Sequence, residues 1–219
     1  MNPPVAFRFL TPLLCILALP AFASDPAAPF SGAAYAQSAA SKGVVLVAAR
    51  WARQWKCGRF DHAQLKSLSF DKAGSPKDGP DAKPDLLLED SALLPSPARF
   101  INHAYIVEPG EYALSAFSVK VAKSASDVGY INASRSDLMR DGKSLAGSFS
   151  VAAGEVVYIG HFALDCMKDP IPWRYHPASR DDFNQYLKAV KVEFEAIDTD
   201  KVTFRLFDTT TLGQPFALP

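Results

Sequence analysis

Residues 155–166 read EVVYIGHFALDC, and the way this stretch folds decides both the fold class and the chemistry open to the chain. His161, Asp165 and Cys166 lie within six positions, and all three residue types bind metals or take part in catalysis. The rest of the stretch is β-branched, aromatic or small, which is typical of a strand. It is therefore either a reactive cluster or a strand that ends in a disulfide.

Strand geometry separates these three polar side chains. In a regular strand His161 and Asp165 share one face but lie about 13 Å apart, which is too far to chelate one ion. Cys166 points to the opposite face, unless a bulge at Gly160 shifts the phase. We therefore predict a strand rather than a reactive cluster, with Gly160 marking a bulge or a close backbone approach.

The N-terminus has the features of a secretory signal peptide. Arg8 precedes an apolar run over residues 9–19, and Ala21-Phe22-Ala23 supplies a small-residue cleavage site. The apolar run is too short to span a bilayer, and no second run of spanning length follows. We predict a signal peptide over residues 1–23 and an exported protein, periplasmic or extracellular or associated with the envelope, without a transmembrane segment after cleavage.

The composition excludes several classes of protein. Cleavage would leave 196 of the 219 residues and would remove one arginine and no acid, so that 22 basic residues would face 23 acidic ones. A near-neutral chain lacks the basic surface that nucleic acids require. About half of the residues are apolar, which excludes global disorder, and the length suits a single domain.

Two cysteines, Cys57 and Cys166, would remain after cleavage in an oxidising compartment. We predict a disulfide between them, with two free thiols as the alternative. The bridge would close a loop of roughly 110 residues, worth about 4–5 kcal/mol in the chain-entropy model.

Strand patterns follow one another along most of the chain. Residues 24–41 are small and aperiodic and predict a flexible leader, and residues 43–51 form a β-branched run that predicts a strand buried on both faces. Residues 71–85 are crowded with Gly, Pro and Asp, so we expect an exposed loop.

Turn residues divide the later strands. Pro109-Gly110 lies between two extended runs and predicts a hairpin, and Ala153-Gly154 repeats this scheme before the strand quoted above. Near the C-terminus, residues 190–195 and 202–206 each alternate apolar with polar positions. We expect these two runs to pair as a further hairpin.

One helix is predicted in the C-terminal half. Ser179 is its N-cap, and Asp182 follows three residues later as a capping-box partner. The apolar residues that follow have the spacing of one helix face: Phe183, Tyr186, Leu187 and Val190. The sequence therefore predicts a mainly β fold, a single antiparallel β-sandwich or open barrel over residues 42–219 with one short helix.

Three stretches resemble families of bacterial exported proteins and lipoproteins of unknown function: EPGEYALSAFSVK (108–120), GSFSVAAGEVVYIGHFALDC (147–166) and VTFRLFDT (202–209). Those families carry a P-G-x-Y-x-L turn followed by a G-E-x-x-Y-x-G strand, and the resemblance covers about residues 85–209. It implies a β-sandwich in the cell envelope and assigns no catalytic residue. This chain lacks the small residue that a lipobox requires before Cys15, so we expect no lipid anchor.

Two segments are candidates for ligand binding. Trp173, Tyr175 and His176 lie in the proline-rich segment DPIPWRYHP (169–177), which either lines a groove for a ligand such as a peptidoglycan fragment or seals the end of the sandwich as a rigid loop.

The second candidate is RWARQWKCGRF (50–60), in which Arg53 lies between Trp51 and Trp55. Basic residues interleaved with tryptophans occur in proteins that bind anionic surfaces. We favour the alternative that the tryptophans fill the core beneath arginine stems, because no wider excess of positive charge is present.

The sequence contains no recognised catalytic motif and implies no cofactor. The favoured prediction is an exported protein that works by binding or structural association rather than catalysis, with an envelope component or a small ligand as its partner. A metal-binding protein that uses His103 and His161 is the alternative, and a hydrolase with a site built from scattered acids is a second one.

Overall fold

The computed structural model of this protein describes residues 26–77, 82–90, 96–141 and 143–213. The elements, in chain order, are β1 (Ala28–Pro29), α1 (Gly32–Ser38), β2 (Gly43–Ala49), β3 (Gln54–Cys57), β4 (Phe60–Lys72), β5 (Leu86–Glu89), β6 (Ile101–Val107), β7 (Gly110–Ala122), β8 (Val128–Ala133), α2 (Arg135–Leu138), β9 (Met139–Arg140), β10 (Lys143–Ser144), β11 (Ser148–Val151), β12 (Val156–Asp165), β13 (Ile171–Tyr175), α3 (Arg180–Glu193), the 3-10 helix η1 (Thr199–Lys201) and β14 (Val202–Phe204).

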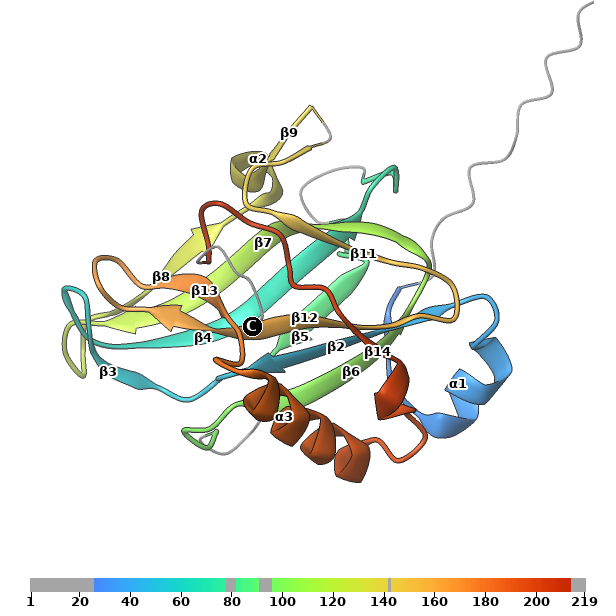
Figure 1. Ribbon diagram of the computed structural model, residues 1–219. Helices are drawn as coiled ribbons and strands as arrows, with labels where there is room; N and C mark the ends of the chain where they lie inside the picture. The colour runs from blue at the N-terminus through green and yellow to red at the C-terminus, as the bar shows by residue number, and fades with distance from the viewer. Residues whose placement is uncertain (1–25, 78–81, 91–95, 142, 214–219) are drawn as a thin grey trace, which may run out of the picture.

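Two six-stranded sheets form the body of the protein (Figure 1). Sheet A has the strand order β1-β6-β2-β12-β13, with β14 beside β12, and sheet B has the order β11-β7-β4-β3, with β5 beside β4 and β8 beside β7. The predicted mainly β sandwich is confirmed. Most neighbours are antiparallel, but β12 runs parallel to both β2 and β14, which the sequence did not indicate.

The main core lies between the two sheets, and a second core lies on the outer face of sheet A. Among the largest side chains of the main core are Trp51, Tyr112, Phe70, Phe162 and Phe207. In the second core, α3 packs against sheet A (Figure 1) through Phe183, Tyr186 and Val190. The centre of sheet A is therefore covered on both faces, and every residue of β2 is buried, as its continuous apolar run predicted.

The two turns predicted to close hairpins instead carry the chain between the sheets. Pro109-Gly110 joins β6 of sheet A to β7 of sheet B, and Ala153-Gly154 joins β11 of sheet B to β12 of sheet A. At the first corner the Tyr112 hydroxyl donates a hydrogen bond of 2.8 Å to the carbonyl of Glu108, four residues upstream. Such a tyrosine corner fixes a crossing between two sheets, so the hairpin prediction is wrong here.

The predicted C-terminal hairpin is also wrong, because its first arm belongs to α3. Ser179 caps this helix as predicted, and its hydroxyl accepts a hydrogen bond from the Asp182 amide. Val190 is fully buried seven positions after Phe183, whereas Val192 is 78% exposed, so the helical period decides the structure of this run. The second arm, β14, pairs with β12.

The N-terminal segment is structured from β1 onward, which corrects the prediction of a flexible leader over residues 24–41. β1 pairs with β6, and the Ser31 hydroxyl caps α1 by accepting a hydrogen bond from the Ala34 amide. Phe30 and Tyr35 then pack against the second core. The predicted signal peptide, residues 1–23, lies outside the described residues.

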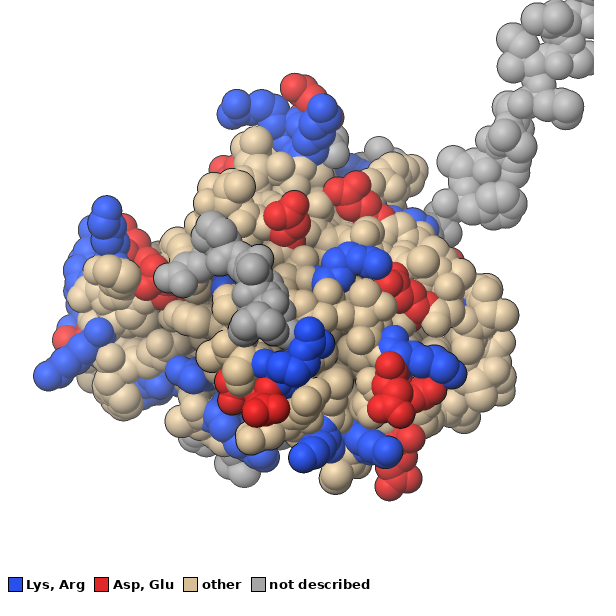
Figure 2. Space-filling view, viewed as in Figure 1, with Lys and Arg blue, Asp and Glu red and all other residues tan. Residues whose placement is uncertain are grey.

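Charges of both signs are interspersed on the face of the protein that carries α3 (Figure 2). Ion pairs such as Lys201–Asp198 and Arg205–Glu155 lie near the surface. This visible face therefore presents no broad field of one sign.

Gly160 interrupts β12 with a bulge, as predicted. The pairing with β2 shifts register between Tyr158 and His161, and Gly160 has a φ of +119°. An added Cβ would lie 2.9 Å from Cγ of Arg174, so the position also requires a close backbone approach. The shift in phase brings Phe162 into the core between the sheets and leaves His161 on the outer face of sheet A.

The predicted disulfide is confirmed. Cys57 at the end of β3 is bonded to Cys166 just after β12, with a distance of 4.5 Å between the two Cα atoms. The Gly58 amide also donates a hydrogen bond to the Cys166 carbonyl. The bridge therefore joins sheet B to sheet A at one end of the sandwich.

We predict that the double substitution Cys57→Ser and Cys166→Ser lowers the free energy of unfolding by about 4 kcal/mol. The bridge joins residues 109 positions apart, and its loss releases the corresponding loop entropy in the unfolded chain. Equilibrium denaturation of the oxidised protein and the double variant measures the difference. An unchanged denaturation midpoint would show that the bridge contributes nothing to stability.

Candidate functional site

The outer face of sheet B carries small and polar side chains. In β4, Leu68 and Phe70 point into the core, so Ser67, Ser69 and Asp71 point outward. Neighbouring β7 has the same alternation, with an irregularity of register against β4. The short helix α2 contacts β7 at one end of this face, and four large apolar side chains stay exposed on the rest of it: Trp55, Leu87, Val128 and Tyr130.

A pocket of roughly 300 Å³ or more can hold a small ligand. The groove at the α2 end of this face has a volume of about 620 Å³. Ser69 of β4 and Ala116 of β7 contribute to its floor, together with the buried Ser115. One wall comes from the described residues between β4 and β5, and the other from α2 and its flanks. The wall residues are Lys77, Ala82, Pro84, Ser134, Arg135, Ser136 and Met139.

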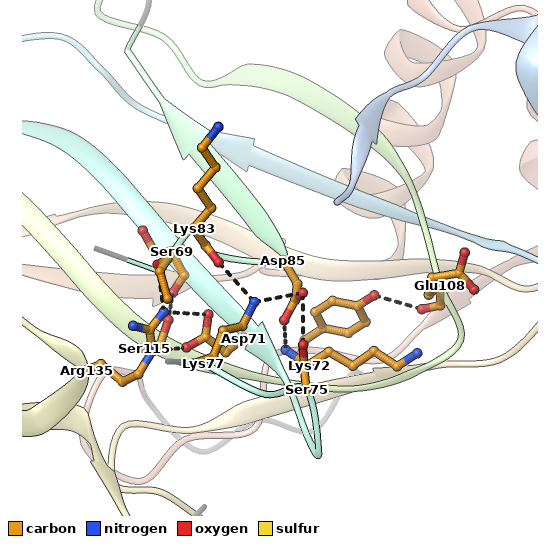
Figure 3. Close-up of polar contacts among 12 residues, drawn as sticks. Ser69, Asp71, Lys72, Ser75, Lys77, Lys83, Asp85, Glu108, Ser115 and Arg135 are labelled. Carbon is orange, nitrogen blue, oxygen red and sulfur yellow. Dashed lines mark hydrogen bonds and ion pairs between the residues drawn. The ribbon is translucent and has the colours of Figure 1, made fainter. Parts of the chain in front are cut away.

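A buried ion pair fixes the α2 wall to the floor (Figure 3). The Arg135 Nε atom donates to Oδ2 of Asp71 over 2.5 Å, and Nη2 donates to Oδ1 over 3.2 Å. Asp71 is 4% exposed, and its hydrogen bond and charge raise the pKa of the Arg135 guanidinium. Arg135 also donates to the Ala82 carbonyl of the opposite wall, so one side chain bridges the groove.

A second buried carboxylate organises the other wall. Asp85 is 4% exposed and accepts hydrogen bonds from the Lys72 amide over 2.8 Å and from the Ser75 hydroxyl over 3.3 Å. Lys77 forms an ion pair with Asp85 over 2.9 Å and donates to the Lys83 carbonyl (Figure 3). Each groove cation thus has a carboxylate of its own, and the two pairs together carry no net charge.

These groove residues were missed at the level of sequence. Residues 71–85 were expected to form an exposed loop, yet Asp71 still belongs to β4 and both Asp71 and Asp85 are buried. The period-2 pattern of β4 contained the signal, because Asp71 continues the outward series of Ser67 and Ser69. Nothing in the local sequence identifies Arg135, 64 residues away, as its partner.

The two predicted tryptophans of residues 50–60 have different environments. Trp51 is 2% exposed in the main core, as the favoured interpretation predicted. It also donates a hydrogen bond from Nε1 to Nε2 of His103 over 3.0 Å. Trp55 is 68% exposed, which corrects that interpretation for this residue. Its ring lies 5.2 Å from the Arg53 guanidinium and 5.3 Å from the His62 ring, on the same face of sheet B as the groove.

Trp173, Tyr175 and His176 lie on or next to β13, an edge strand of sheet A, rather than near the groove. β13 pairs with β12 through Trp173 opposite Ala163 and Tyr175 opposite His161. The Tyr175 hydroxyl donates to the Leu164 carbonyl, and His176 Nδ1 lies 2.8 Å from the Pro177 carbonyl. This segment is a paired strand and its continuation, which corrects the expectation of a rigid loop.

His103 and His161, the alternative metal ligands, point to opposite faces of sheet A. His103 contacts Trp51 on the side of the main core, whereas His161 contacts Phe100 and Tyr186 in the second core beneath α3. The sheet therefore keeps these two imidazoles from sharing one ion. Within the described ranges, no three His, Cys, Asp or Glu side chains are grouped to hold a metal ion.

The stretch that looked reactive is structural. Cys166 is in the disulfide, and Asp165 accepts a hydrogen bond from the Met167 amide. His161 Nδ1 lies 3.0 Å from the Tyr158 hydroxyl, and burial, followed by the charge of His176, lowers the pKa of His161 to about 4. The predicted strand thus separates its three polar side chains, as expected.

Comparison with models of protein families, with curated proteins and with solved structures gives no match. In the ranges that the structure describes, the helices are all too short or too polar to cross a membrane.

We predict that replacing Arg135 by Met lowers the free energy of unfolding by about 3 kcal/mol, because the buried Asp71 carboxylate loses its cation. Adding Asp71→Asn should recover most of this loss, since a neutral amide needs no counter-charge. Denaturant titration of the single and double variants measures both changes.

The matched control for Arg135→Met is Lys201→Met, which removes the cation of the exposed Lys201–Asp198 ion pair. This variant should leave the free energy of unfolding almost unchanged, because exposed ion pairs contribute little to stability. If Arg135→Met behaved like this control, the buried pair would not hold the groove wall.

We predict that His161 makes stability depend on pH between about 6.5 and 4. Its folded pKa of about 4 lies below the unfolded value of roughly 6.5, so folding favours the neutral ring. The stabilisation is complete above pH 6.5 and is lost as the pH falls toward 4, by up to about 3 kcal/mol. His161→Gln should reduce this loss, whereas His62→Gln on the outer face of sheet B should retain most of it. Unfolding free energies at several pH values between 7 and 4 provide the test.

Proposed function

We propose that this protein is exported and works by binding a small polar ligand, or a polar part of an envelope component, in the groove on sheet B. The observation that carries the proposal is a hollow of about 620 Å³ whose two walls are held by buried ion pairs. Walls fixed before a ligand arrives lose little entropy when it binds. The groove combines a small-residue floor with a few placed polar groups, as ligand sites do.

Three observations support export. The N-terminal sequence has the features of a signal peptide, and later stretches resemble bacterial exported proteins. The Cys57–Cys166 disulfide is of the kind that forms in oxidising compartments outside the cytoplasm.

The state of the groove acids favours binding over catalysis. A general base must be within reach of the proton that it abstracts. Asp71 and Asp85 are both 4% exposed, and each is engaged by at least one cation. These carboxylates therefore hold the walls of the groove, while the exposed Ser134 and Ser136 are placed to contact a ligand.

The test measures ligand binding by thermal unfolding, first with the unaltered protein and then with a variant whose groove is blocked by a large side chain. The probes are three polar classes, which are neutral oligosaccharides, dipeptides and nucleotides. We expect one class to raise the melting temperature of the mature chain, since a ligand at 100 times its Kd adds about 2.7 kcal/mol. Ala116→Trp, which places an indole on the groove floor, should abolish this shift.

Ala153→Trp is the matched control, because Ala153 lies in an exposed turn between β11 and β12. It should bind the probe like the unaltered protein. The proposal fails if no probe class shifts the melting temperature, or if the Ala116→Trp variant keeps the full shift.

A further inference from the structure

We infer that the ligand is a neutral oligosaccharide that lies along the outer face of sheet B, from the groove to Trp55 and Tyr130. This inference rests on the proposed function and names its ligand class. The track consists of the outward-facing side chains of β3, β4, β5, β7 and β8.

Strand register places the track residues in rows across the sheet. The first row, at the end of the sheet farthest from the groove, contains Trp55, His62, Ala122 and Val128. The next rows, in order toward the groove, contain Gln64, Lys120 and Tyr130; then Glu89, Ser67, Ser118 and Asn132; and finally Leu87, Ser69 and Ala116. Ser69 and Ala116 also form the groove floor, so the track is continuous with the groove. From His62 to Ser69 the track is about 20 Å long, enough for several sugar rings.

The middle of the track offers hydrogen-bonding groups that the protein does not use. The side chains of Ser67, Ser118 and Asn132 make no hydrogen bond to any other residue in the described part of the chain. Hydroxyl and carboxamide groups both donate and accept, which matches the hydroxyls of a sugar. Their small size leaves room above the sheet for a chain to lie flat.

Two exposed aromatic rings stand at the end of the track away from the groove. Trp55 is 68% exposed and Tyr130 is 58% exposed. The negative face of an aromatic ring attracts the partial positive charge of the C–H groups on one side of a sugar ring. Arg53 and His62 hold the Trp55 ring in place, so its binding surface is largely preorganised.

The charge of the track favours a neutral ligand over a polyanion. Among the track residues the negative charge of Glu89 balances the positive charge of Lys120. In the groove, Asp71 and Asp85 neutralise the cations Arg135 and Lys77. A protein partner fits less well, because the centre of a protein interface is apolar whereas the centre of this track is polar.

The experiment measures how affinity depends on ligand length. Isothermal titration of the mature protein uses chitobiose and chitotetraose, maltose and maltotetraose, and cellobiose and cellotetraose. We expect one tetrasaccharide to bind at least tenfold more tightly than its disaccharide, because only the longer chain reaches the aromatic rings. Trp55 on β3 and Tyr130 on β8 lie at opposite edges of the track, so at least one of the variants Trp55→Ala and Tyr130→Ala should weaken tetrasaccharide binding about tenfold and leave disaccharide binding unchanged. Ala116→Trp should abolish binding of both sugars.

Two control variants remove exposed side chains elsewhere. Val192→Ala on α3 and Tyr175→Ala on β13 should both bind the tetrasaccharide normally. Circular dichroism verifies that each variant is folded.

The inference is overturned if the tetrasaccharide binds no more tightly than the disaccharide, or if the Trp55 and Tyr130 variants retain full affinity. It is also overturned if the probe that binds through Trp55 is anionic, either oligogalacturonate or vesicles of phosphatidylglycerol. Binding of a dipeptide that Ala116→Trp blocks would overturn the ligand class but keep the groove function. Failure of every probe class would overturn both.

Discussion

The two sheets of this protein are covered unequally, and the location of the candidate site depends on that difference. β2 is apolar at nearly every position, so both of its faces must be removed from water. The main core covers one face, and α3 and α1 cover the other through residues such as Tyr186 and Tyr35. β4 instead alternates apolar with polar side chains and needs a cover on one side only. Sheet B is therefore left with a face on which a ligand can lie.

Residues that suggest chemistry in the sequence serve the fold here, and residues that suggest a simple loop build the groove. His161 is enclosed by aromatic rings beneath α3, and Cys166 links the two sheets. Both roles follow from one strand, β12, in which the Gly160 bulge adjusts the phase so that Phe162 enters the core. Asp71 and Asp85, by contrast, are buried beside the groove, where Asp71 pairs with Arg135 of α2 and Asp85 accepts a hydrogen bond from the Lys72 amide.

Several features of the fold that depend on residues close together in the sequence were predicted correctly. The buried strand β2, the N-cap of α3, the bulge at Gly160 and the disulfide could all be predicted from residues close in sequence or from the cysteine count. Whether a turn closes a hairpin or carries the chain to the other sheet could not be predicted, because Pro109-Gly110 fits both. The strand after this turn pairs with β4, β8 and β11, and the turn residues themselves contain no information about those pairings. The Arg135–Asp71 pair and the parallel pairing of β12 with β2 join positions far apart in the chain, and no local pattern records such contacts.

The buried ion pairs of the groove are better explained by geometry than by stability. Taking Asp71 or Asp85 out of water costs about as much as its attraction to Arg135 or Lys77 returns, so an apolar pair of similar volume would stabilise the fold at least as well. An apolar pair would not, however, hold a hydroxyl-bearing wall at a fixed distance from the floor, since dispersion contacts have little directionality. The forked contact of Arg135 with Asp71 does have a direction, and its further bond to the Ala82 carbonyl reaches the opposite wall. Both walls are thus positioned by charge-assisted hydrogen bonds whose charges cancel, which leaves the open groove shaped but neutral.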